Sequence, residues 1–337
     1  MALLTFSDKG FYCPPGDFYI DPWRQVNKAV ITHAHSDHAR YGHRQYIAQQ
    51  DSVPLLKLRL GSFIQATGYP YGTSFSIRGV KVSFHPAAHV LGAAQVRLEY
   101  KGEVWVVTGD YKLAPDPLAG SFEPVPCHTF ITECTFGLPI YQWPEPMQVF
   151  TEINDWWREN QEEGRTSILS AYSLGKAQRI LCSVDAGIGP IYAHGAIENT
   201  HDVIRQMGIA LPKTERITDK TNKKDLTGAL VLTPSSGMAS NWIRRFADPV
   251  TAAASGWMMV RGNRRRQSVD RGFVLSDHVD WNALNAVIGE LHPEKIYVTH
   301  GFTDLFARWL QDQGYDADVV RTEYSGENEE PLEEVTG

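Results

Sequence analysis

The stretch ITHAHSDHARYGH, residues 31–43, holds four histidines and one aspartate among thirteen residues. The apolar run before it, KAVI, is typical of a strand. Strand side chains repeat every two residues, so His33 and His35 are expected on the same side, and Asp37 and His38 can point back from the start of a following helix. Imidazole and carboxylate groups are ligands for zinc or manganese. Two histidines with an Asp-His pair exceed what one ion needs, so the spacing predicts two adjacent ions rather than a solvated histidine-rich loop.

Length and composition bound the class of protein. The 337 residues are enough for one large or two ordinary domains, and 42% hydrophobic and 11% aromatic residues suit a folded enzyme. No run of about 18 apolar residues occurs and the first residues do not resemble a signal peptide, so no membrane segment is expected. Four cysteines without C-x-x-C spacing argue against a zinc ribbon or disulfide framework and favour a cytoplasmic protein.

The hydrophobic pattern changes near residue 140. Before it, short β-rich runs alternate with turns, and several end in a polar residue, as strands do when their ends carry a site. These runs are 18–22, 27–35, 80–87, 94–100, 103–110 and 128–135. After Pro146 a helical pattern leads into strand-helix units at 166–184, 190–208, 272–291 and 295–314, with buried strands at 229–237 and 256–260. This alternation predicts a parallel α/β region. Because no linker separates the parts, the middle region is expected to be inserted into a larger domain.

Further ligand candidates stand at the ends of apolar runs downstream. They are His89, Asp110 and His300. We assign the first ion to His33, His35 and His89, and the second ion to Asp37, His38 and His300. Asp110 is short and anionic, and so suited to bridging both ions. Asp21, at the end of FYID, is expected to orient a ligand histidine rather than to bind metal.

Taken together, these motifs are similar to those of the metallo-β-lactamase superfamily. Asp21, the HAHSDH string, His89 and TGD at 108–110 resemble its four successive motifs. Two later segments, SAYSLGKAQ at 170–178 and VLTPSSGM at 231–238, resemble parts of the β-CASP insertion. The resemblance implies an α/β protein: an αββα metallo-β-lactamase sandwich with an inserted α/β β-CASP domain. The expected parts are 1–145, the inserted domain 146–265, and a closing part 266–337 with an acidic tail.

The same resemblance extends to three further motifs. Glu133, His278 and His300 match motifs A, B and C of the β-CASP proteins, which are nucleases acting on DNA or RNA. The compact length and the run RGNRRRQSVDRGFVLSDHVDW most resemble the bacterial DNA ligase-associated exonucleases, which are Artemis-like. Artemis-type enzymes typically have valine at motif C, whereas the histidine at 300 is shared with the RNA-processing members.

The chemistry implied is phosphodiester hydrolysis with two divalent ions, zinc or manganese. Such a site lowers the pKa of a bound water and offsets charge in the transition state. Asp37 and Asp110 are the catalytic carboxylates of that site. The resemblance makes His278 the candidate donor of a proton to the leaving oxygen, and Glu133 the carboxylate that fixes the tautomer of His278.

Candidate nucleic-acid contacts come from three segments. A dense basic run comprises Arg261, Arg264, Arg265, Arg266 and Arg271. Such a run can follow a phosphate backbone although the formal net charge is −7, because net charge is a poor guide where charges are segregated. Other side chains could hold a terminal phosphate, with capping and surface roles as the alternative. These are Ser235, Ser236, Lys176 and Arg179.

The resemblance implies a DNA exonuclease, working from a 5′ end on single-stranded or end-containing DNA. Its setting would be bacterial repair, with a DNA ligase and a helicase as partners. Three alternatives stay open. An RNA-processing nuclease of the RNase J or polyadenylation type is favoured by His300. A non-catalytic β-CASP scaffold is disfavoured by the intact ligand set, and a small-molecule hydrolase leaves the inserted region unexplained.

Overall fold

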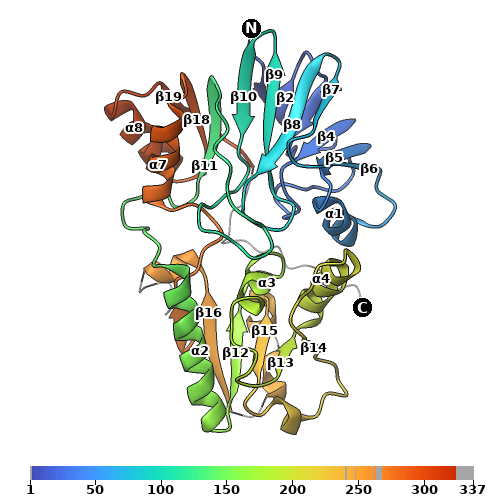
Figure 1. Cartoon of the computed structure of the whole chain (residues 1–337), viewed down its shortest axis with the longest axis vertical. Helices are drawn as coiled ribbons and strands as arrows, with labels where there is room; N and C mark the ends of the chain where they lie inside the picture. Colours follow the sequence, from blue (N-terminus) through green and yellow to red (C-terminus); the bar gives the residue numbers. More distant parts are fainter. Residues whose placement is uncertain (1, 240, 247, 261, 263–267, 324–337) are drawn as a thin grey trace. The chain divides into compact units, whose positions relative to one another are not determined.

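The chain divides into two compact units. Figure 1 shows the computed structural model, which describes residues 2–239, 241–246, 248–260, 262 and 268–323. Among the described residues, the first unit comprises those up to Gln142 and 278–323, and the second comprises those between Trp143 and Asp277. The first unit is therefore built from both ends of the chain.

One sheet of the first unit contains the start of the chain. Its strand order is β1-β2-β3-β4-β5-β6, with antiparallel pairing up to β3 and parallel pairing from β3 to β6. Helix α1 contacts β5 and β6. The bounds are β1 (Thr5–Ser7), β2 (Gly10–Cys13), β3 (Phe18–Ile20), β4 (Lys28–Ile31), β5 (Gln45–Gln49), α1 (Ser52–Leu60) and β6 (Ala66–Tyr69).

The second sheet of this unit joins residues from both chain segments. Its order is β19-β18-β11-β10-β9-β8-β7, antiparallel from β7 to β10 and parallel from β10 to β19. The strands are β7 (Ser74–Ile77), β8 (Val80–Pro86), β9 (Ala94–Tyr100), β10 (Glu103–Val107), β11 (Thr129–Cys134), β18 (Lys295–Gly301) and β19 (Ala317–Val319). Two helices flank β18 in the chain: α7 (Trp281–Leu291) precedes it, and α8 (Thr303–Asp312) lies between β18 and β19.

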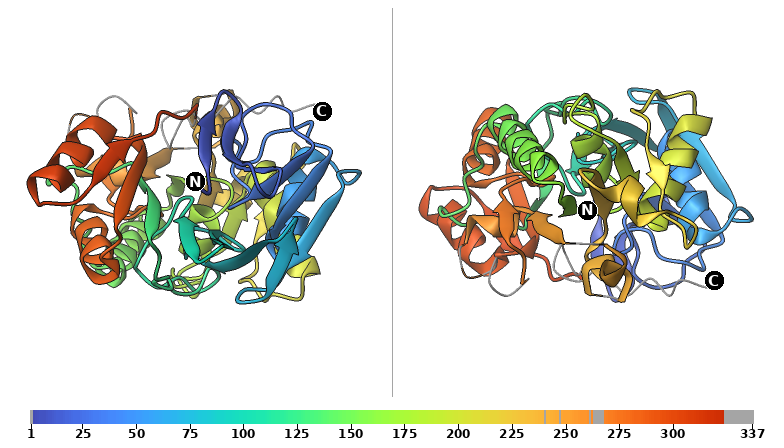
Figure 2. Two further views of the ribbon diagram at one scale, coloured as in Figure 1. Left: turned by 90° about the horizontal axis from the view of Figure 1, so that it is seen from above. Right: turned by 90° about the horizontal axis from the view of Figure 1, so that it is seen from below.

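The two sheets bury their apolar side chains against each other. Phe18 and Val30 of the first sheet share one cluster with Val82 and Leu98 of the second. On the opposite face of the second sheet, side chains of β11 and β18 pack against α7 and α8, which Figures 1 and 2 show beside β18 and β19. All six residues of β11 are buried, as expected for a strand covered on both faces.

The second unit is a parallel α/β structure. Its sheet has the order β14-β13-β15-β12-β16-β17, and every pair is parallel. The strands are β12 (Thr166–Ser170), β13 (Ile191–Ala193), β14 (Glu215–Arg216), β15 (Leu230–Thr233), β16 (Pro249–Ala254) and β17 (Arg271–Phe273). The helices are α2 (Pro146–Glu162), α3 (Lys176–Leu181), α4 (Gly195–Gln206), η1 (Lys223–Leu226), α5 (Ser235–Ala239), η2 (Asn241–Arg245) and η3 (Gly256–Met259).

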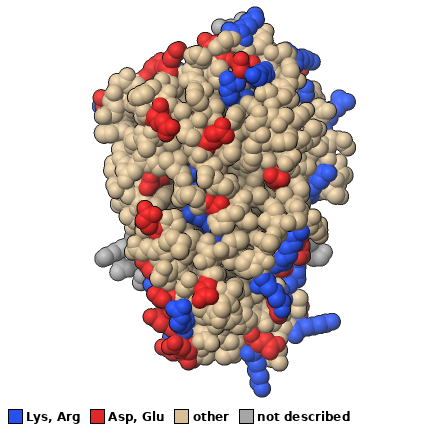
Figure 3. Space-filling model, in the orientation of Figure 1, with Lys and Arg blue, Asp and Glu red and all other residues tan. Residues whose placement is uncertain are grey.

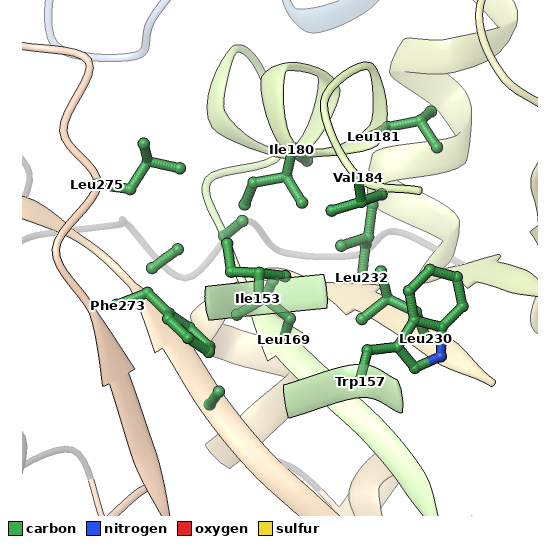
Figure 4. Close-up of a cluster of buried hydrophobic side chains, with 14 of the residues drawn as sticks. Ile153, Trp157, Leu169, Ile180, Leu181, Val184, Leu230, Leu232, Phe273 and Leu275 are labelled. Atoms are coloured by element: carbon green, nitrogen blue, oxygen red, sulfur yellow. The ribbon is translucent and has the colours of Figure 1, made fainter. Parts of the chain in front are cut away.

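Helix α2 supplies much of the core of this unit. Ile153 and Trp157 lie on the face that packs against Leu169 of β12 and Leu230 of β15, as Figure 4 shows. The indole Nε1 of Trp157 donates to the carbonyl of Gly228 at 3.0 Å, so the buried ring leaves no polar atom unpaired. The sheet and α2 thus form a core that belongs to the second unit alone.

The predicted α/β class is confirmed, and one predicted strand is wrong. Residues 256–260 contain η3, and the strand lies earlier, at β16. The sequence of β16, PVTAAA, begins with proline and is rich in alanine, so it lacks the usual strand signal.

The predicted insertion ended at 265, whereas β17 pairs with β16 and the units divide after Asp277. The acidic tail lies outside the described residues. No helix in the described part of the chain is long and apolar enough to cross a membrane.

Candidate metal centre

The candidate ligands stand at the carboxyl ends of strands in the first unit. His33 follows β4, His89 follows β8, Asp110 follows β10, and His300 lies near the end of β18. Strands β10, β11 and β18 run parallel, so their carboxyl ends meet at one edge of the second sheet. The topology therefore gathers residues that are up to 267 positions apart, from 33 to 300, in one place.

Asp110 lies between two groups of histidines. Its Oδ2 is 3.5 Å from Nε2 of His33 and 3.7 Å from Nε2 of His89. Its Oδ1 is 3.4 Å from Nε2 of His38 and 2.8 Å from Nε2 of His300. Each carboxylate oxygen thus faces a different pair of imidazoles. This is the geometry expected of a carboxylate that is shared by two ions.

The remaining ligand candidates complete the two groups. Nδ1 of His35 lies 3.1 Å from Nε2 of His89, and Asp37 Oδ2 lies 3.8 Å from Nε2 of His38. Ligand atoms lie within 4.8 Å of one another in each of four sets. These sets are His33, His35, His89 and Asp110; His38, Asp110 and His300; His33, Asp37 and His38; and Asp110, Glu133 and His278. The buried cluster fits a dinuclear metal site, and the role of each ligand stays a prediction.

The chemistry of the donors fits metal ions better than a self-contained hydrogen-bond network. The side chain of His33 is fully buried, yet its Nε2 forms no hydrogen bond with any described residue. A buried nitrogen without a partner is costly, and a metal ion uses the lone pair of a neutral imidazole. His33 therefore stays a candidate ligand.

Burial and neighbouring charges shift the titration of the cluster in opposite directions. Burial, reinforced by His38, lowers the pKa of His33 well below its usual value. Burial alone would also lower the pKa of His38, but the carboxylates of Asp110 and Asp37 raise it well above its usual value. For Asp110, burial opposes ionisation, but His38, His278 and His300 hold its pKa well below the usual range. The cluster thus keeps buried anionic oxygens that favour cations.

Each of three candidate ligand histidines has a hydrogen-bond partner on its Nδ1. Asp21 Oδ2 lies 2.8 Å from Nδ1 of His38, and Asp21 itself accepts from the amide of Thr32 at 2.8 Å. The hydroxyl of Thr32 is 3.1 Å from Nδ1 of His33, and the hydroxyl of Thr299 is 3.1 Å from Nδ1 of His300. Partners of this kind fix the ring so that Nε2 points at the centre.

These threonines were not anticipated, although the sequence carries a signal. The dipeptide Thr-His occurs at both strand ends, in VITHAH and in YVTHG. Asp21 occupies the place expected for a carboxylate that orients a ligand. The helix expected after the histidine string is absent from these residues, since 36–38 form a turn closed by a bond from Ala39 N to His35 O at 2.8 Å.

Glu133 and His278 lie beside the cluster. Nδ1 of His278 is 2.9 and 2.8 Å from the two carboxylate oxygens of Glu133, and both side chains are buried. Glu133 Oε1 also accepts from the amide of Tyr111 at 2.9 Å. The other ring nitrogen of His278, Nε2, is 4.0 Å from Asp110 Oδ2 and so faces the candidate metal centre. The catalytic roles of this pair stay predictions.

Lys112 supports the centre and was missed by sequence reasoning. Its side chain is only 2% exposed, and its ammonium donates to the carbonyls of Ala88 and of His89, the latter at 2.7 Å. It also forms an ion pair with Asp116 at 3.1 Å. Ala88 has a φ of 57°, in the left-handed region that costs energy for alanine. A lysine two residues after a candidate ligand was the available signal.

The predicted nucleic-acid contacts receive uneven support. Arg261, Arg264, Arg265 and Arg266 lie outside the described residues. Arg271 is half-buried in β17, its guanidinium 5.0 Å from the ring centre of Phe273, and Ser235 and Ser236 are exposed at the start of α5. Lys176 and Arg179 are each only 2% exposed, and Arg179 is paired with Asp277 at 3.1 Å. Their burial gives no support to a phosphate contact.

Two further observations bear on the sequence predictions. His43, the last histidine of the stretch 31–43, is buried, and its Nδ1 accepts from the amide of Val26 at 3.3 Å. Figure 3 shows acidic and basic side chains interspersed over one face, with uncharged surface between them. The net charge of −7 therefore does not make this face uniformly acidic.

Comparison with known proteins supports the resemblance. The chain is 30% identical over 311 residues to a protein of Opitutus terrae named "Probable DNA ligase", a match that covers 91% of this chain and 30% of that protein. It is 28% identical over 169 residues to the endoribonuclease ysh-1 of Neurospora crassa, covering 48% of this chain and 19% of that protein. An RNase J-like protein of Methanocaldococcus jannaschii is 24% identical over 205 residues, covering 52% and 48%.

The chain spans less than half of the length of these relatives. No family model matches it. A solved structure of a protein of unknown function from Enterococcus faecalis shares the fold, with a TM-score of 0.59 and 13% identity over 88% of this chain and 80% of that chain. The resemblance of this chain to the metallo-β-lactamase and β-CASP nucleases, indicated by its motifs, is confirmed by these relatives.

Proposed function

We propose that this chain is a metal-dependent nuclease that hydrolyses phosphodiester bonds, and that its substrate is DNA, degraded from a 5′ end. The proposal of phosphodiester hydrolysis rests on the placement of Asp110, whose two oxygens face two separate histidine pairs. A small-molecule hydrolase is disfavoured, because it leaves the whole second unit without a role.

The fold we propose is the αββα sandwich of the metallo-β-lactamases with an inserted β-CASP domain. The support is threefold. Two sheets share a core with helices on the outer faces, residues 143–277 form a separate parallel α/β unit, and the motifs named above fall in the corresponding parts. The inserted domain then extends to Asp277 rather than to 265.

The residues of the cluster would hold two divalent ions, zinc or alternatively manganese. Such ions supply a nucleophilic hydroxide at neutral pH and stabilise negative charge on the phosphorane-like transition state. His33, His35 and His89 would hold one ion, Asp37, His38 and His300 the other, and Asp110 both. Glu133 accepts from Nδ1–H of His278 and orients the ring. In the imidazolium form, Nε2–H of His278 can then donate its proton to the leaving oxygen.

DNA is favoured over RNA by one comparison. The relative named as a probable DNA ligase aligns with 91% of this chain, whereas the endoribonuclease aligns with 48%. This chain would then act in repair together with a DNA ligase and a helicase. RNA processing is the second candidate, supported by His300 and by the relatives named as endoribonuclease and RNase J-like. The free cysteines support a cytoplasmic location.

The test is degradation of end-labelled DNA and RNA of identical sequence by the purified chain, with zinc or manganese added. The proposal predicts release of nucleotides from the 5′ end of DNA with either ion, and none in chelator. His278→Ala should sharply lower the rate of release, whereas His292→Asn, a change at an exposed histidine with φ of 44°, should not. Cleavage of RNA alone would replace the DNA proposal, and no cleavage of either would favour a scaffold.

A further inference from the structure

The first unit contains a polar cavity away from the candidate metal centre. Its volume is about 400 Å³, within the range of pockets that hold small ligands. Lys9, Tyr19, Lys28 and Arg44 are among its lining residues. Lys28 is the first residue of β4, and the residue that pairs with it, Gln45, follows Arg44 directly. The cavity therefore lies at the amino ends of the parallel strands of the first sheet.

The candidate ligands His33, His35, Asp37 and His38 follow the opposite end of β4. Five residues separate Lys28 from His33, which corresponds to about 16 Å of extended chain at roughly 3.3 Å per residue. No candidate metal ligand lines the cavity. It is thus a second site, whose ligand would not contact the hydrolytic centre directly.

The charge of the cavity favours an anion. The side chains of Lys9, Lys28 and Arg44 form no ion pair with any residue that the structure describes. The carboxylate among the lining residues, Asp17, is already engaged, by Arg78 at 2.9 Å and by the hydroxyl of Tyr12 at 3.1 Å. Three cations that line one concave surface, none of them in an ion pair with a described residue, attract a compact polyanion.

Neutral donors complete the lining. The side chains of Gln25 and Asn27 supply amide N–H groups, and the hydroxyl of Tyr19 is a further donor. Burial, followed by the charges of Asp8 and Asp17, raises the pKa of Tyr19, so its hydroxyl keeps its proton. Gly42, with φ of 97°, lies so close to the side chain of Gln25 that a Cβ would collide with it. Glycine there lets the loop after the histidine string close this wall of the cavity.

We infer that this cavity binds a phosphate group, through Lys9, Lys28 and Arg44, at a site separate from the hydrolytic centre. The phosphate can belong to a free nucleotide or to the backbone of a nucleic acid strand. The inference does not require nuclease activity, because it rests on the cavity and its charges alone.

The test compares binding by the full-length chain and two double variants. Lys28→Gln with Arg44→Gln removes two cations from the cavity. Lys101→Gln with Lys220→Gln removes the same charge from exposed positions elsewhere. Calorimetric titrations use inorganic phosphate, AMP and a phosphorothioate 10-mer, at two salt concentrations. Circular dichroism verifies folding, and nuclease activity is measured on the same preparations so that loss of that activity is scored separately.

The inference predicts at least a tenfold weaker affinity for the cavity variant and less than a twofold change for the control. Loss of AMP and phosphate binding identifies a free nucleotide as the source. Loss confined to the 10-mer, with a salt slope reduced by about 1.4 for two charges on a single strand, identifies the strand backbone. The single variant Arg44→Lys, which keeps the charge, should retain most of the affinity of the unmodified chain. Equal affinities of the cavity and control variants for all three probes would overturn the inference.

Discussion

Glu133 binds His278 through both of its carboxylate oxygens, which lie 2.9 and 2.8 Å from Nδ1. The two residues are 145 positions apart in the chain, and both are buried. With Nδ1 occupied in this way, Nε2 is left facing Asp110 at 4.0 Å. The pair thus presents one defined imidazole nitrogen to the place where substrate chemistry is proposed.

Substitution of His278 should separate proton transfer from metal binding. We expect His278→Ala to lower turnover by about 10²- to 10⁴-fold, the range typical of a lost general acid, with metal content unchanged. Glu133→Gln should lower it by a smaller factor, because the imidazole remains but its tautomer is no longer fixed. Steady-state rates and metal content by mass spectrometry measure the two effects. Loss of metal from His278→Ala would instead make His278 a ligand.

Asp21 should control metal affinity without touching the metal. Asp21→Asn weakens the bond to Nδ1 of His38, and we expect affinity for zinc to fall by roughly ten- to a hundred-fold. Competition with a chromophoric chelator measures this. Asp8→Asn, a change at an exposed aspartate, is the matched control. Unchanged affinity in Asp21→Asn would mean that the turn holding His38 is rigid without its carboxylate partner.

Lys112 should be needed for stability. Its removal in Lys112→Met leaves the buried carboxylate of Asp116 and the carbonyls of Ala88 and His89 without their ammonium donor. Breaking a buried ion pair in this way costs about 3 kcal/mol of unfolding free energy. Lys101→Met at an exposed turn should cost less than about 0.5 kcal/mol. Urea denaturation compares the two variants, and equal effects would contradict the role of Lys112.

Glu198 should make the second unit sensitive to acid. Burial alone would raise its pKa, but hydrogen bonds from His201, Arg205 and Thr214 hold the pKa at about 2. A folded-state pKa below the unfolded value gives stability that is present above about pH 4.5 and is lost as the pH falls toward 2. The shift corresponds to at most about 3 kcal/mol.

Glu198→Gln should therefore flatten the pH dependence of unfolding between about pH 4.5 and pH 2. Urea denaturation at several pH values, followed in parallel for the exposed-site control Glu159→Gln, measures the slope. The control should keep the slope of the unmodified chain. A slope that is the same in both variants would show that the network around Glu198 does not govern acid stability.

Local patterns in the sequence singled out the candidate metal ligands, because the strands before them are short, apolar and followed at once by polar residues. The alternation in β4 and the apolar runs before Asp110 and His300 are local signals, and the parallel topology then brings them together. The burial of long charged side chains was harder to predict from the sequence. Lys112, Lys176 and Arg179 are long cations that local sequence favours at the surface, and only tertiary packing places them inside.

The strand at 249–254 likewise depends on tertiary contacts that the local sequence does not reveal. Its proline and three alanines give no β-branched pattern at its end, and it forms because β12 and β17 pair with its two edges. The apolar run at 256–260 has the better local signal, yet residues 256–259 form η3 and pair with no described strand. Pairing partners that are distant in sequence decided which segment became the strand.

The most direct test of the account is nuclease rate against metal equivalents. Protein stripped of metal would be titrated with zinc or manganese, and release of label from a 5′-labelled DNA strand would be followed at each ratio. If Asp110 joins two ions in one hydrolytic site, the rate rises until two equivalents have been added and then levels off. A plateau at one equivalent, or no hydrolysis at any ratio, would contradict the central claim.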